Sequence, residues 1–113
     1  MTEEQPSDLV WREEMLADLA SGDITRSTTA LLSLTYNEPD RLWLEDLLLR
    51  EAEPANDPQL RALAVICMGH IGRLRGEVSR RVVARLEALL DDPTLGGTAE
   101  DALGDIRDLA TIV

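Results

Sequence analysis

The feature that most constrains the fold is a helical pattern that begins at Asp57 and ends at Gly72. Asp followed by Pro is a strong start signal, because the carboxylate accepts hydrogen bonds from the free N–H groups of the first helical turn and Pro lacks one such group. Apolar and small residues then recur every third or fourth position, which predicts one buried helix face. Small residues on that face also let a second helix approach closely. The buried face comprises Leu60, Ala64, Cys67, Met68 and Ile71.

This pattern recurs thirty-five residues later, where Asp92 and Pro93 repeat the start signal. The helix before each copy also repeats, as LEDLL at Leu44–Leu48 and LEALL at Leu86–Leu90. A weaker copy starts at Asp23. A helix pair this small cannot bury its own apolar face, so repetition predicts stacked pairs with one shared core. The recurring face positions are Leu95, Ala99, Ala102, Leu103 and Ile106.

We therefore predict an all-α fold, a short α-solenoid of about three helix pairs, in a single domain of residues 1–113 with residues 1–6 flexible. No strand-like alternation of apolar and polar residues competes with this prediction. The six helices are expected at residues 8–20, 24–36, 39–53, 58–74, 77–90 and 98–110.

The pattern D-P-x-[apolar]-R-x-x-A-[apolar]-x-[small]-[apolar]-G-x-I-G resembles the inner helix of a HEAT-like (PBS-lyase-type) repeat. The runs TALLSLTYNEPDRLW, AVICMGHIGRLRG and AEDALGDI are similar to short bacterial HEAT-like proteins associated with toxin–immunity loci, including contact-dependent growth inhibition. The resemblance implies a non-catalytic protein-binding module, and most specifically an immunity protein that binds and neutralises a cognate toxin domain. A general scaffold or adaptor subunit of a larger assembly is the alternative.

Charge points to the class of partner. The formal net charge is −11, which repels nucleic acid and anionic membrane and favours a basic protein partner. Nuclease-type toxins carry cationic substrate clefts and would fit. No basic-then-apolar leader and no apolar run near eighteen residues occurs, so we expect a cytoplasmic protein without a membrane span.

Few residues offer chemistry. His70 is the sole histidine and is expected to face outward without a nucleophile beside it, and Cys67 is expected to be a buried small apolar residue. No cysteine or histidine has metal-ligand spacing, and no glycine-rich phosphate loop is present. We therefore expect no enzyme activity, no metal and no cofactor. A lyase-like enzyme of the HEAT type would need a ligand cleft with reactive groups.

The acidic residues of the last predicted helix are the strongest candidates for binding. Asp101, Asp105 and Asp108 share one helix face, with Glu100 beside them. A solvated face is the ordinary interpretation, and a metal site would need ligands from elsewhere. The third interpretation is a docking surface for a basic partner, which would include Ile66, His70 and Arg73. Equivalent repeat positions predict a contiguous strip of Thr35, His70 and Asp105 beside Leu31, Ile66 and Asp101.

Two further groups stand out. Arg73, Arg75, Arg80, Arg81 and Arg85 form a local cationic run, for which pairing with the protein's own carboxylates is the favoured interpretation. Trp11 and Trp43 are expected to be buried, although an exposed tryptophan would be an interface anchor.

Overall fold

The computed structural model describes residues 6–113. The segment predicted to be flexible therefore lies outside the described residues, except for Pro6, which begins the first helix. The prediction of an all-helical fold with six helices is confirmed over the described part of the chain, and two short strands are added to it. The elements are α1 (Pro6–Leu19), α2 (Ile24–Asn37), α3 (Arg41–Glu51), α4 (Pro58–Arg75), β1 (Glu77–Val78), α5 (Arg80–Leu89), α6 (Gly96–Leu109) and β2 (Thr111–Ile112).

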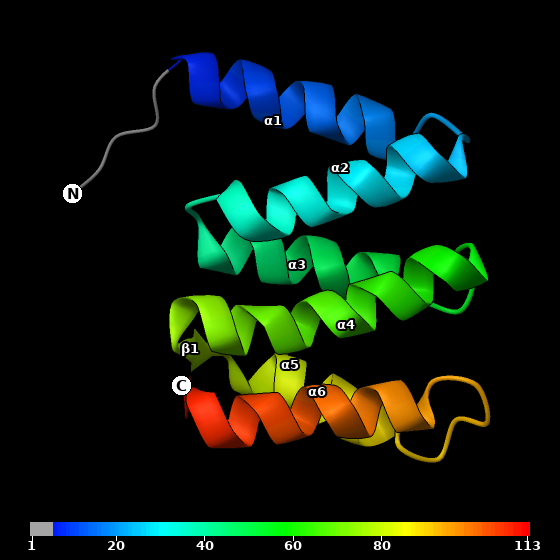
Figure 1. The fold of residues 1–113 in the computed structure, drawn as a ribbon, viewed down its shortest axis with the longest axis vertical. Helices are drawn as coiled ribbons and strands as arrows, with labels where there is room; N and C mark the ends of the chain where they lie inside the picture. Colours follow the sequence, from blue (N-terminus) through cyan, green and yellow to red (C-terminus); the bar gives the residue numbers. More distant parts are fainter. Residues whose placement is uncertain (1–5) are drawn as a thin grey trace.

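The helices form two layers (Figure 1). Helices α1, α2, α4 and α6 form the front layer, in which they follow one another along the long axis, and α3 and α5 lie behind them. Helix α4 is central, because it contacts α2, α3 and α6, and α5 packs against α6. The molecule measures 41 × 35 × 16 Å, so it is a flattened slab with one extended core.

Aspartates set the helix starts, as the sequence predicts. The Asp23 carboxylate accepts from the backbone N–H groups of Thr25 and Arg26, and Asp57 accepts from those of Gln59 and Leu60. Asp92 does the same for Thr94 and Leu95, both at 2.8 Å, although α6 itself begins only at Gly96. The third helix begins at Arg41 and not at residue 39 as predicted, because Asp40 is its cap.

Helices α4 and α6 approach each other very closely at small residues. A Cβ atom on Gly69 would lie 3.1 Å from the Ala102 Cα atom, and one on Gly72 would lie 3.1 Å from Ile106 Cγ1. The predicted close helix approach is therefore confirmed. Gly72 lies inside the contact, whereas Gly76 ends α4 in the left-handed conformation, with φ of 70°.

The predicted start of the fifth helix at residue 77 was wrong, because residues 77–79 are not helical and α5 begins at Arg80. Gly76 turns the chain so that Glu77–Val78 forms a parallel pair with Thr111–Ile112. The Thr111 N–H donates to the Gly76 carbonyl at 2.9 Å, and the Val113 N–H donates to the Val78 carbonyl at 2.9 Å. This short sheet joins the ends of α4 and α6.

Two buried glutamates connect helices α1 and α3 to the rest of the fold. Glu45 is fully buried and accepts from Arg41 at 2.8 Å, from Arg81 at 3.3 Å and from the Ser79 N–H at 3.0 Å. Glu38 accepts from Arg12 through both carboxylate oxygens, at 2.8 Å each, and from the Asp40 N–H at 2.8 Å. These contacts join α3 to the β1–α5 junction and α1 to the α2–α3 loop.

The α4–α6 contact yields a matched stability test. Gly69→Ala should destabilise the protein by about 1–3 kcal/mol, because the added methyl group would lie closer to the backbone of the facing helix than an ordinary contact and would push the two helices apart. Gly104→Ala on α6 should stabilise it by about 0.5–1 kcal/mol, since nothing lies within 4 Å of its added Cβ and Ala is the better helix former. Urea unfolding followed by circular dichroism measures both. Equal effects of the two substitutions would contradict the packing described here.

Candidate functional site

Three of the predicted partner-binding residues lie together across α4 and α6. Arg73 Nε lies 3.8 Å from Asp105 Oδ2, and the Arg73 guanidinium also donates to Nδ1 of His70. The Tyr36 ring of α2 completes this group, with its centroid 5.7 Å from that of His70. We call these four residues (Tyr36, His70, Arg73 and Asp105) the central cluster. It spans three successive helices of the front layer.

Electrostatics in the central cluster favour a neutral imidazole. Partial burial lowers the pKa of His70, the Arg73 charge lowers it further, and Asp105 opposes both. A neutral ring leaves Nδ1 free to accept from Arg73. Arg73 therefore lies between an imidazole and a carboxylate and holds both in place.

The remaining acidic residues of α6 point to solvent. Asp101, Asp108 and Glu100 are exposed, and none of them forms an ion pair within residues 6–113. A helix turns by about 100° per residue, so Asp101 and Asp108 share the face of Asp105 while Glu100 lies on the outer edge of α6. Three of the four predicted carboxylates thus face the same side.

The predicted strip of equivalent positions was wrong at its first helix. Leu31 and Thr35 are fully buried, and Tyr36 occupies the position beside His70. The cause is the repeat spacing: the capping aspartates Asp23 and Asp57 are thirty-four residues apart, not thirty-five. A shift of one residue rotates a helix position by about 100°, which exchanges a buried side chain for an exposed one.

Exposed apolar side chains lie next to the acidic positions. Tyr36 is 51% exposed and Ile66 is 41% exposed, and Leu74 follows at helical spacing on α4. Sequence reasoning missed Tyr36 and Leu74, since it placed Thr35 on this face. Helical spacing could have identified Leu74, which lies four residues after His70 and eight residues after Ile66. We define the front face as Tyr36, Ile66, His70, Arg73, Leu74, Asp101, Asp105 and Asp108.

The cationic run is largely engaged within the protein. Arg81 pairs with Asp46 and Glu45, whereas Arg75 and Arg85 donate to backbone carbonyls, including that of Leu49 at 3.0 Å. Pairing with carboxylates thus holds for Arg73 and Arg81, and carbonyl oxygens serve Arg75 and Arg85. The Arg80 side chain is exposed and forms no ion pair or hydrogen bond within residues 6–113.

The thiol and both indoles take structural positions. Cys67 is fully buried, and burial raises the pKa of its thiol to about 11, against a hydrogen bond with Thr35 that lowers it. Trp11 and Trp43 pack partly buried against the core. The Arg12 guanidinium lies 4.3 Å from the centroid of the Trp43 ring.

Metal binding and membrane insertion are the remaining functional classes. Within residues 6–113, no group of three or more His, Cys, Asp or Glu side chains is arranged to hold a metal ion. None of the helices in that part of the chain combines the length and the apolar character needed to cross a membrane.

Comparison with known proteins gives a match among solved structures. No family model matches the sequence, and no curated protein does. Among solved structures, the chain is similar to a protein in the "Crystal structure of CDI complex from Cupriavidus taiwanensis LMG 19424", with 31% identity and a TM-score of 0.74. The alignment covers 96% of this chain and 96% of the other.

The central cluster predicts how His70 titrates. Its pKa should lie below the ordinary value of about 6.5, because burial and Arg73 disfavour the imidazolium. Arg73→Gln should raise this pKa and Asp105→Asn should lower it further. Because the pKa of His70 is lower in the folded chain, its neutral imidazole contributes to the free energy of unfolding above the ordinary pKa. This contribution is lost as the pH falls below the ordinary pKa. Two-dimensional NMR of the imidazole across pH 4–8 measures this, and a pKa that neither variant changes would contradict the cluster.

Proposed function

The chain belongs to the same protein family as the matched component of the Cupriavidus taiwanensis CDI complex, and from this premise we propose that it is an immunity protein that binds and neutralises a cognate toxin domain. CDI abbreviates contact-dependent growth inhibition, in which a toxin is paired with its immunity protein. The observation that carries the proposal is the 31% identity over 96% of both chains. Sequence identity at this level along nearly the whole of both chains supports a shared role, which likeness of fold alone would not.

The proposed mechanism is occlusion without catalysis. The helix pairs would act as HEAT-like repeats of a short α-solenoid, which present successive helices of one layer to a partner. The front face fits this role, because exposed apolar residues on α2 and α4 adjoin exposed carboxylates on α6. Apolar anchors supply affinity, and charges at the side fix orientation.

Charge supports a basic partner, and a nuclease-type toxin in particular. A net charge of −11 would steer the protein toward a cationic surface and speed association. A nuclease must hold phosphate groups in a cationic cleft, and Asp101, Asp105 and Asp108 would compete for the same cations. The proposed site of action is the cytoplasm, where such a toxin would meet nucleic acid.

Charge reversal on the front face tests the docking surface. Asp101→Lys combined with Asp108→Lys should lower the affinity for the toxin domain on the order of tenfold or more and should slow association. Neither carboxylate pairs within residues 6–113, so the fold should be retained. Biolayer interferometry at 50 and 500 mM NaCl against a catalytically inactive toxin domain encoded beside the gene measures both effects. Wild-type affinity should also fall at the higher salt.

The matched control is Glu13→Lys combined with Glu14→Lys, which changes net charge equally on exposed positions of α1. If both double variants weaken binding equally, only overall charge matters and the front face is not the docking surface.

A pull-down from the native host identifies the partner itself. One stoichiometric basic partner supports the immunity role, whereas a large multi-protein assembly would favour a scaffold role.

A further inference from the structure

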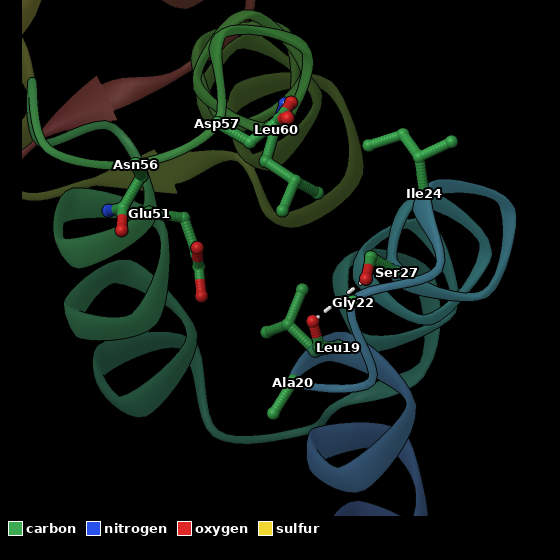
Figure 2. A pocket seen from close by; sticks show the side chains of 9 residues that line it. All are labelled: Leu19, Ala20, Gly22, Ile24, Ser27, Glu51, Asn56, Asp57 and Leu60. Carbon is green, nitrogen blue, oxygen red and sulfur yellow. Dashed lines mark hydrogen bonds between the residues drawn. The ribbon is translucent and has the colours of Figure 1, made fainter.

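A cleft lies at one end of the helix layers, away from the central cluster. It has a volume of about 360 Å³ and opens between the α1–α2 turn and the α3–α4 loop. In Figure 2, the Glu51 side chain extends from the end of α3 into the space bounded by Leu19 and Leu60, with Ile24 on the far side. The cleft therefore combines apolar walls with two carboxylates, those of Asp57 and Glu51, and of these two it is Glu51 that has no hydrogen-bond partner within residues 6–113.

The other polar side chains of the cleft are already engaged. Asp57 caps α4 through the N–H groups of Gln59 and Leu60, and Ser27 donates to the Leu19 carbonyl at 2.8 Å. Asn56 donates to the Arg50 carbonyl at 2.6 Å. Their hydrogen bonds maintain the shape of the loops and turn.

Glu51 differs from these residues. Its carboxylate forms no hydrogen bond or ion pair with residues 6–113. Burial raises its pKa, and the neighbouring Arg50 only partly opposes this. A carboxylate that has lost part of its hydration without gaining a partner is unfavourable, so a cation delivered to the cleft would relieve the cost.

The geometry and chemistry select the kind of cation. Leu19, Ile24 and Leu60 offer apolar surface for a chain of methylene groups, while Glu51 can accept two parallel N–H bonds. A guanidinium on an alkyl stem meets both requirements, and its weaker hydration makes it easier to desolvate than an ammonium group. We propose that this cleft binds an arginine side chain of the partner protein, with Glu51 as its carboxylate.

The identity of the occupant rests on the proposed function, whereas binding of the guanidinium does not. Leu60 and His70 both lie on α4, about 15 Å apart along the helix. A partner that reached both would contact the protein at two separated places. The arginine in the cleft would then fix the orientation that the front face alone leaves open.

The first experiment uses a small probe. The full ¹⁵N-labelled chain is titrated with N-acetyl-L-arginine methylamide and followed by heteronuclear NMR. Amide shifts should be confined to residues 19–27 and 51–60, with a Kd on the order of millimolar for such a small ligand. Glu51→Gln should weaken binding about fivefold or more. The control Glu53→Gln removes the same charge from an exposed position on the neighbouring loop and should leave binding unchanged.

The neutral isostere N-acetyl-L-citrulline methylamide distinguishes charge recognition from apolar contact. Equal shifts with this probe, or probe binding unchanged by Glu51→Gln, would overturn the proposal. Thermal unfolding supplies a second readout. Glu51→Gln should raise the unfolding midpoint at pH 7, because it removes a partly buried charge, whereas a lower midpoint would identify Glu51 as a structural residue and count against the site.

A third measurement separates this inference from the proposed function. In the toxin-binding assay, a weaker complex with Glu51→Gln and an unchanged one with Glu53→Gln supports the partner's arginine as the occupant. Unchanged affinity for both variants overturns that occupant while leaving the immunity role standing. Failure of the wild-type chain to bind the toxin overturns the immunity role, and the probe titration still decides whether the cleft binds a guanidinium.

Discussion

The close packing of α4 against α6 is the constraint on which the rest of the structure depends. Gly69 faces Ala102 and Gly72 faces Ile106, at separations that would place an added methyl group closer to the facing helix than an ordinary contact. This contact fixes the spacing between two helices of the front layer and so allows Arg73 to reach Asp105. The short β1–β2 sheet continues the same contact beyond the helix ends. The geometry of the front face thus follows from small residues in the core, which carry no functional groups themselves.

Polar contacts determine where helices α1, α3 and α5 lie. Burying Glu38 and Glu45 costs desolvation free energy, and their arginine and backbone partners offset it. Leucine-rich helices could slide against one another, because apolar contacts are not directional. Sliding these helices would separate Glu38 from Arg12, or Glu45 from Arg81 and the Ser79 N–H, and would leave a buried carboxylate without these partners. The uniform core therefore supplies stability, while these two glutamates supply the register of α1, α3 and α5.

Local signals in the sequence were sufficient to predict the helices but not their long-range partners. Aspartate caps and helical periodicity act within one turn, so the six helices and the small-residue contact could be predicted. The β1–β2 pair depends on residues more than thirty positions apart, and the burial of Glu38 depends on Arg12, twenty-six positions away. For the candidate site, an interval of thirty-four residues in place of thirty-five was enough to exchange Thr35 for Tyr36. A repeat in the sequence therefore predicts which segments are helical more accurately than it predicts which helix faces are exposed.

The distribution of charge links stability to binding. Strong net charge weakens a compact fold through self-repulsion. This chain carries −11, and Asp101, Asp108 and Glu51 have no ion-pair partner in the part of the chain that the structure describes. Such carboxylates add little to the isolated protein, since they are either solvated or partly desolvated without compensation. A cationic surface would relieve repulsion on α6 and supply the missing partner in the cleft at once. Binding and stabilisation would then come from the same residues, because any partner that binds only the folded chain also favours folding.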